Sequence, residues 1–236
     1  MKEYLQRITE ESKEKYQEQL KEKLKKNIKA FIITVNPETL MLSKKEKALK
    51  HLLLDYNNSL VPDGIAVVKA CQKIGMNVVE RITGIDLAEY LLSLANKEKY
   101  TLALFGTTKE VLEQLVLKIK KEYPNIKILE YSDGYIENKE EEMQKIVKLN
   151  PDICLVALGI PKQELLISKY IENAKKGIYI GVGGSFDVLS GVKKRAPKIF
   201  IKLNLEWLYR IIKEPKRIKR FWNNNVKFLI KVRREK

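Results

Sequence analysis

Six short apolar runs, each followed by a charged segment with helical periodicity, constrain the fold more than any other feature of the sequence. The runs are "AFIITV" (30–35), "LVP" (60–62), "YTLALFG" (100–106), "IKILEY" (126–131), "ICLVALG" (153–159) and "GIYIGVGG" (177–184). Helices are predicted at 7–27, 38–56 and 64–75, from the end of the third run to about Lys121, and at 137–149 and 162–175. Apolar strands that alternate with amphipathic helices indicate a parallel sheet covered by helices on both faces. The predicted fold class is therefore α/β and Rossmann-like.

Basic charge is concentrated at the C-terminal end of the chain. The 236 residues have a formal net charge of +16, and Val192–Lys236 alone holds 16 Lys and Arg against 3 Glu. That segment has a net charge of +13, which leaves +3 for Met1–Gly191. We therefore predict an α/β catalytic domain over 1–195 and a basic, helical, membrane-associating appendage over 196–236. An excess of this size favours an anionic partner, namely nucleic acid, acidic lipid headgroups or a phosphorylated substrate.

The tail also contains apolar and aromatic residues interleaved with Arg and Lys, in "LNLEWLYRIIKEPKRIKRFWNNNVKFLIKVRREK". Pro215 is expected to end or kink its first helix. This composition suits a helix that lies on an anionic membrane surface. A tail helix that packs its apolar side on the body is an equal alternative, and the two can coexist. Self-association into a homo-oligomer is a further alternative when no bilayer is present.

Several classes of site are excluded by composition. The two cysteines, Cys71 and Cys154, lie far apart inside apolar runs, which fits a reducing cytosol and gives no disulfide framework. His51 is the single histidine, so a multi-histidine metal site is excluded. No run of about 18 apolar residues spans a membrane, and the N-terminus is too polar for a secretion signal. We expect no metal or other cofactor.

Polar residues and glycines follow five of the predicted strands. They occur in "TVNPE" (34–38), "PDG" (62–64), "GTTKE" (106–110), "GIPKQE" (159–164) and "GGSFD" (183–187), and the candidates for binding are Thr34, Asn36, Gly106, Thr107, Gly159, Gln163 and Gly183. Ligands of open parallel sheets gather at the carboxyl ends of the strands. Each turn alone is explained by ordinary helix capping, and none matches the Walker or G-x-G-x-x-G pattern. Together, the five turns favour a nucleotide pocket.

Asp63 is a lone acid within an apolar stretch. It has two interpretations: an N-cap for the helix that starts near Gly64, or a general base with a raised pKa at a strand end. The chain has no Asp-x-Asp, which counts against a metal-bridged diphosphate. Charge on a leaving diphosphate would then fall to Arg, Lys or helix N-termini, with Arg81 and the tail arginines as candidates.

The ordered segments "TVNPE", "PDGIAVV", "ERITGIDL", "LGIPKQE", "GVGGSFDVLSG" and "RAPKIF…LEWLYRIIKEPKR" resemble the WecG/TagA/CpsF glycosyltransferases, family 26. The likeness runs from about Thr34 to Arg220, and "PKQE" and "EWLYR" are its most distinctive parts. The opening "MKEYLQRI" departs from the short apolar strand with which members often begin, which leaves the edge of the sheet open.

The resemblance implies an inverting transfer of an N-acetylmannosamine-type sugar from a UDP donor. The implied acceptor is N-acetylglucosamine on undecaprenyl diphosphate, and the product serves wall teichoic acid or another surface polysaccharide. Asp63 takes the family's base position, while Thr34, Asn36, Arg81 and Gln163 match residues associated with the site. Arg210, Arg217 and Arg220 match arginines that close over the diphosphate.

The resemblance also implies that the tail brings a cytoplasmic enzyme to the inner face of the cell membrane. Binding of nucleic acid is the alternative function, and the net charge motivates it. Against it, the charge is confined to the tail, and the body lacks stacking-aromatic or recognition-helix patterns.

Overall fold

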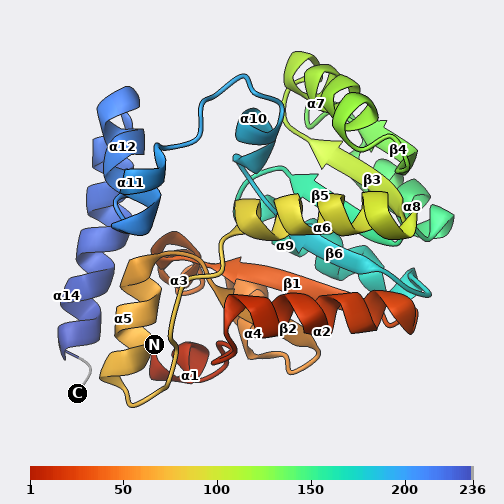
Figure 1. The fold of residues 1–236 in the computed structure, drawn as a ribbon. Helices are drawn as coiled ribbons and strands as arrows, with labels where there is room; N and C mark the ends of the chain where they lie inside the picture. The colour runs from red at the N-terminus through yellow and green to blue at the C-terminus, as the bar shows by residue number, and fades with distance from the viewer. Residues whose placement is uncertain (235–236) are drawn as a thin grey trace.

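The computed structural model describes residues 1–234, apart from the side chains of Arg217, Arg220 and Arg234. All six predicted strands are present in one parallel sheet of order β2-β1-β6-β5-β3-β4. The strands are β1 (Ala30–Val35), β2 (Asn58–Pro62), β3 (Thr101–Gly106), β4 (Lys127–Ser132), β5 (Ile153–Ala157) and β6 (Ile178–Gly181). Figure 1 shows the sheet at the centre of the molecule, with helices around it. The predicted α/β, Rossmann-like class is confirmed.

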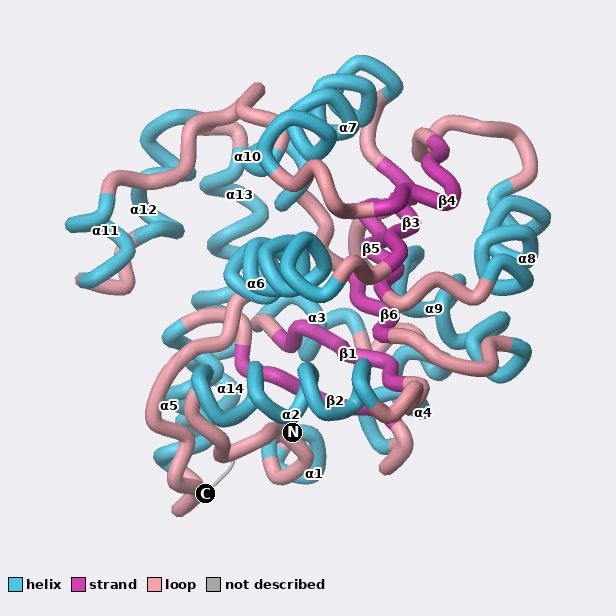
Figure 2. Tube along the Cα trace, turned by 45° about the vertical axis from the view of Figure 1, so that its right-hand side comes forward, coloured by secondary structure: helices cyan, strands magenta, loops and turns pink. Residues whose placement is uncertain are grey.

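Helices cover both faces of the sheet, as expected, and Figure 2 shows strands between α6 and α9. One face packs against α1 (Lys2–Leu5), α3 (Pro37–Leu42), α4 (Lys47–Leu54), α5 (Ile65–Lys73), α8 (Lys139–Leu149), α9 (Lys162–Tyr170) and the short η1 (Ile171–Asn173). The other face packs against α2 (Lys13–Lys25), α6 (Gly84–Glu98), α7 (Lys109–Glu122) and α10 (Ser185–Leu189).

Alternation of side chains along each strand builds these two cores. In β1, Phe31, Ile33 and Val35 point to the first face, whereas Ile32 points to the second. Successive strand residues face opposite sides of a sheet, so a strand covered on both faces must be apolar at nearly every position. This explains why the central strands read as continuous apolar runs.

The N-terminal third departs from the prediction in two places. The expected helix 7–27 begins only after Ser12, which caps α2; before it, Ile8 forms a parallel bridge with Leu60 and extends the sheet beside β2. The expected helix 38–56 is broken into α3 and α4 by a turn at 43–46. The opening residues therefore cover the edge strand, which answers the question that the polar "MKEYLQRI" left open.

Helix α6 was not predicted. Its signals are present: Thr83 caps its first turn, Asp86 follows, and apolar residues recur with helical spacing to Ala95. Helices α5 and α6 together connect β2 to β3, and because they cover opposite faces, the chain passes from one face of the sheet to the other between them.

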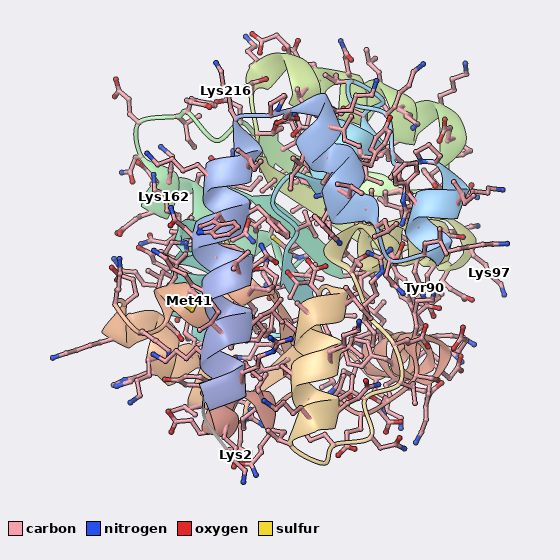
Figure 3. The ribbon with its side chains drawn as sticks, turned by 90° about the vertical axis from the view of Figure 1, so that its left-hand side faces the viewer. Lys2, Met41, Tyr90, Lys97, Lys162 and Lys216 are labelled. Carbon is pink, nitrogen blue, oxygen red and sulfur yellow. The ribbon has the colours of Figure 1, made fainter. Side chains whose placement is uncertain are left out.

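The tail consists of α11 (Lys198–Lys202), α12 (Glu206–Lys213), α13 (Arg217–Phe221), the π-helical turn η2 (Trp222–Val226) and α14 (Lys227–Arg234). Helix α12 ends before Pro215, as expected. The tail helices run along one end of the sheet, with α14 beside α5 (Figures 1 and 3). The division of the chain into domains at residue 195 stays a prediction.

The structure supports packing of the end of the tail on the body, while docking of the tail on a membrane stays a prediction. Phe228 and Val232 are buried in the same core as α5, and Lys73 Nζ donates to the Val232 carbonyl at 3.0 Å. Eight large apolar residues of the tail remain exposed: Ile199, Leu203, Trp207, Ile212, Ile218 and Trp222 between α11 and η2, and Leu229 and Ile230 in α14. The end of the tail therefore packs on the body, while α11 to η2 present apolar side chains to solvent. No helix within residues 1–234 is both long and apolar enough to cross a bilayer.

Candidate active site

The C-terminal ends of the parallel strands meet at one edge of the sheet. Val35 of β1 is in register with Pro62 of β2, and Gly106 of β3 is in register with Ala157 of β5. Thr34 Oγ1 donates to the carbonyl of Gly181, where β6 ends, at 3.3 Å. The turns that follow these strands, which the sequence singled out, are therefore neighbours in space.

Asp63 stands directly after β2 on this edge. Its backbone N–H donates to the Val35 carbonyl at 2.8 Å, which fixes the residue to the neighbouring strand end. The N-cap of α5 is Gly64, with φ of +116°, so Asp63 is not the cap residue. The N-cap interpretation is therefore wrong. The interpretation as a base remains.

The surroundings of the Asp63 carboxyl favour its protonated form. Burial is the main cause, and it raises the pKa from 3.8 to about 6. The positive charges of Arg210 and Arg81 oppose this effect, whereas Glu206 and Asp86 add to it. The carboxyl is buried, whereas the residue as a whole is partly open to solvent. A carboxylate with such a pKa is ionised at neutral pH and is a stronger base than an ordinary Asp.

An ion-pair chain links the body to the tail beside Asp63. Arg81 Nη1 lies 3.2 Å from Glu206 Oε2, and Arg210 Nη2 lies 2.7 Å from Glu206 Oε1. Arg81 Nη2 also donates to the Ile201 carbonyl at 3.4 Å. The structure thus brings together Asp63, Arg81 and Arg210, which the sequence had grouped only by residue type and resemblance. It adds Glu206, which the sequence analysis missed, although its i,i+4 spacing from Arg210 was a readable signal.

Two further predicted residues, Thr34 and Asn36, lie at the end of β1. Thr34 is buried, and Asn36 is the N-cap of α3, where its Oδ1 accepts from Thr39 N–H at 3.0 Å. These bonds give both side chains a structural role. Their predicted contact with the sugar stays a prediction.

Gln163 joins two of the predicted turns. Its Oε1 accepts from the N–H of Gly159 at 3.1 Å and from that of Gly183 at 3.2 Å. The side chain is 1% exposed, and its Nε2 donates to Glu164. A Cβ at Gly181 would come within 2.4 Å of this amide, so the strand end must be a glycine for Gln163 to fit. In this arrangement Gln163 braces the β5 and β6 turns against each other.

Gly106 and Thr107 form a tight turn after β3. Gly106 has φ of +124°, and a Cβ there would lie 2.4 Å from the Ala157 carbonyl oxygen. Thr107 N–H donates to that same carbonyl at 2.9 Å, and the Thr107 carbonyl accepts from Gly134 N–H at 2.8 Å. Thr108, not Thr107, caps α7. The backbone N–H of Thr107 is therefore engaged within the protein, although it was a candidate for binding phosphate.

Glu164 is a second buried acid near this edge that the sequence analysis did not single out. It is fully buried, and burial raises its pKa to about 7, with Glu38 adding to the effect. Its Oε2 has no hydrogen-bond partner among the described residues.

Two of the predicted arginines, Arg217 and Arg220, fall in α13, but their side chains lie outside the part that the structure describes. Among the described residues, no three His, Cys, Asp or Glu side chains are grouped as a metal site. Whether the reaction uses a metal stays open to experiment.

Comparison with known proteins places this site in a family. Residues 4–236 match the model of the "Glycosyl transferase WecG/TagA/CpsF family". The chain belongs to this family. A Bacillus subtilis relative is 45% identical over 193 residues, which cover 82% of this chain and 75% of the relative. A Bacillus spizizenii relative is 39% identical (81% and 74% covered), and one from Staphylococcus aureus is 38% identical (80% and 74% covered).

All three relatives carry the name N-acetylglucosaminyldiphosphoundecaprenol N-acetyl-beta-D-mannosaminyltransferase. The resemblance found in the sequence motifs is therefore confirmed. The family match also extends beyond the motifs, because it includes the N-terminal residues that cover the edge strand.

Proposed function

We propose that this glycosyltransferase moves N-acetylmannosamine, or a close relative, from a UDP-sugar to the 4-hydroxyl of N-acetylglucosamine on undecaprenyl diphosphate. The product is a β-linked disaccharide lipid for wall teichoic acid or another surface polysaccharide. Family membership and the printed names of the relatives support this choice of sugars and carrier. The observation that carries the proposal is the buried Asp63 carboxyl, on a residue that is itself partly exposed, under the charges of Arg81 and Arg210.

In the proposed reaction, Asp63 accepts the proton of the acceptor hydroxyl as that oxygen attacks the anomeric carbon. The new C–O bond forms on the face opposite the leaving group, and the bond between the anomeric carbon and the diphosphate oxygen breaks. Its electron pair leaves with UDP. A single displacement inverts an α-linked donor to a β-linked product, so one base suffices.

The leaving diphosphate gains negative charge, which fixed cations can stabilise. Arg81 is only 14% exposed at its side chain, so its charge acts in a region where water screens poorly. The Arg210 side chain is 45% exposed, and its Nη2 is paired with Glu206, which leaves the rest of its guanidinium accessible to a ligand. No metal or other cofactor is part of the proposal.

Incubation with a panel of UDP-sugars and a short-chain lipid-diphosphate GlcNAc analogue tests the proposal. Mass spectrometry of the product identifies the donor and acceptor together. Transfer should occur with UDP-N-acetylmannosamine or a close relative, and Asp63→Asn should remove most of it while UDP-sugar binding survives. Near-normal turnover in that variant would remove Asp63 from the mechanism, and failure of every donor would overturn the function.

We also propose that the tail docks on the inner, cytoplasmic face of the cell membrane. The exposed apolar residues of α11 to η2 lie among the basic residues of the tail. Each basic residue near an anionic leaflet contributes on the order of 1 kcal/mol. A chain lacking 196–236 should no longer sediment with anionic vesicles and should work poorly. Sedimentation equal to that of the full chain would contradict this role.

A nucleic-acid-binding function is not favoured, because the family match and the names of the relatives both indicate transfer of a sugar. A salt-dependent shift assay with duplex DNA would show tight binding without the tail if it were correct. Homo-oligomer formation stays a prediction, which sedimentation velocity with and without detergent tests.

A further inference from the structure

We propose that Glu206 is a positioning residue that orients Arg81 and Arg210 beside Asp63. The inference rests on the proposed function for what the two arginines bind. It concerns a residue that does not itself touch the reacting atoms in the proposed mechanism.

The geometry of Glu206 is that of a bridge. Its side chain is 7% exposed, and its two oxygens are divided between two guanidinium groups, Arg81 of the body and Arg210 of the same helix. A buried carboxylate is stable only when it is paired, and here both oxygens are paired with cations. Since each bond uses one terminal nitrogen of an arginine, Glu206 determines the direction in which both guanidinium groups point.

Other contacts hold the tail on the body independently of Glu206. Arg195, the last residue before the tail, pairs with Asp86 and Glu89 of α6 and so fixes where the tail begins, while Phe228 of the tail is buried completely in the core beside α5. These anchors flank Glu206 on both sides in the sequence. Loss of the Glu206 bridge should therefore leave the tail docked but release the arginines from their fixed orientation.

Glu206 also acts on Asp63 through charge. Four charged groups influence the Asp63 carboxyl: Arg210 and Arg81 favour its ionised form, whereas Glu206 and Asp86 oppose it. Removal of the Glu206 charge takes away one effect that raises the pKa of Asp63, and release of the two arginines weakens the effects that lower it, so the pKa should change. Because the base must be deprotonated, the acid limb of the pH–rate profile should then move. A variant that only loosened the fold would not move this limb.

Two substitutions separate charge from shape. Glu206→Gln keeps the length of the side chain and removes its charge, whereas Glu206→Asp keeps the charge and shortens the reach by one methylene. Lys193→Gln is the matched control, since it removes a tail ion pair with Glu214 at 3.2 Å that does not involve either arginine. Phe228→Ala is the control for a released tail.

Docking of the tail is read from a single tryptophan. The chain has two, and Trp222→Phe leaves Trp207, which adjoins Glu206 and stacks on Phe221 at 4.5 Å between ring centroids. When Glu206→Gln is added to the Trp222→Phe background, acrylamide quenching of Trp207 fluorescence should not change. In the Phe228→Ala variant of that background it should rise.

In turnover assays, Glu206→Gln should lower kcat/KM by about 100-fold, the typical effect of misplacing a charged group by about an ångström. Its acid limb should move away from the wild-type position. Glu206→Asp should lose rate with its acid limb unmoved, and Lys193→Gln should behave as the wild type. Wild-type turnover in Glu206→Gln would overturn the proposal. Lost activity with an unmoved acid limb and a quenchable Trp207 would also overturn it.

A double-mutant cycle keeps this test separate from the proposed function. Urea unfolding of Arg81→Gln, Glu206→Gln and the double variant measures the coupling of the two side chains without any substrate. A clear coupling with no sugar transfer by the wild type would leave the bridge standing and refute the function. Additive effects of the two substitutions would refute the bridge.

Discussion

Replacement of Asp63 by Asn should remove turnover and, at neutral pH, make the protein more stable. Burial is the main cause that raises the pKa of Asp63 from 3.8 to about 6. In the unfolded chain the carboxyl has its ordinary pKa. Between these two values the folded protein holds a proton that the unfolded chain has released, so the free energy of unfolding falls as the pH rises through this window. The ionised carboxyl therefore destabilises the fold above about pH 6 and not below pH 3.8.

The size of this effect follows from the shift. A change of about two pKa units corresponds to about 3 kcal/mol of unfolding free energy. Because Asp63 is partly open to solvent, screening reduces the effect to about 2 kcal/mol. For a chain of this length, that is a rise in Tm of about 4–8 °C on removal of the charge.

Thermal unfolding of wild type and Asp63→Asn at pH 4 and pH 7.5 measures this effect, alongside a turnover assay. We expect the variant to be inactive and more stable at pH 7.5, with only a small remainder of the difference at pH 4. A variant that is no more stable than the wild type at pH 7.5 would refute the reasoning about burial. An equal gain at both values would mean that packing, not ionisation, is responsible.

Three other substitutions test the rest of the structure by urea or thermal unfolding. The pKa of Asp152 is lowered, because its hydrogen bond with Lys176 at 2.5 Å helps to outweigh burial, which alone would raise it. Asp152→Asn should therefore lower the free energy of unfolding by about 2 kcal/mol at pH 7. This loss should shrink at acid pH, where the native carboxylate is protonated. The Tyr179 hydroxyl is buried without a partner among the described groups, so Tyr179→Phe should gain about 1 kcal/mol, and a loss would reveal a partner. Gly106→Ala should lower the free energy of unfolding by about 3 kcal/mol, because the new Cβ would clash with the Ala157 carbonyl and because the residue has a positive φ. An unchanged Tm would show that the turn can move.

The strands and the class of fold could be predicted because a doubly covered parallel sheet requires continuous apolar runs. The same argument predicted which turns would meet, since the ends of parallel strands share one edge. Helix ends were less predictable. The break between α3 and α4 lies in a polar stretch, 43–46, whose residues are compatible with a helix, and only tertiary packing decides it.

The roles of individual polar residues were harder to predict, because capping and bracing need the same residue types as binding does. Asp63 had the character of an N-cap and is not one, whereas Asn36, predicted as a binding residue, is also the cap of α3, and its contact with a ligand stays a prediction. Gln163 is predicted as a binding residue from its motif; its amide oxygen accepts hydrogen bonds from two backbone N–H groups, and its contact with a ligand stays a prediction. Such contacts depend on loops that are distant in the sequence, and no local pattern encodes them.

At the strand ends, some polar residues hold the backbone in place while others are available for chemistry, and this has a physical reason. A catalytic group must be held within a fraction of an ångström, and this requires neighbours that are themselves immobile. The bonds of Gln163 and Asn36 make the sheet edge rigid, and the backbone bond of Asp63 to Val35 transmits that rigidity to the base. The cations come from two sources, since Arg81 belongs to the body and Arg210 belongs to the tail. The position of the proposed base is therefore fixed by the sheet, whereas part of the charge around it depends on how the tail is docked. Because Arg210 and Glu206 shift the pKa of Asp63, a tail docked on a membrane would control both the charge at the site and the strength of the proposed base.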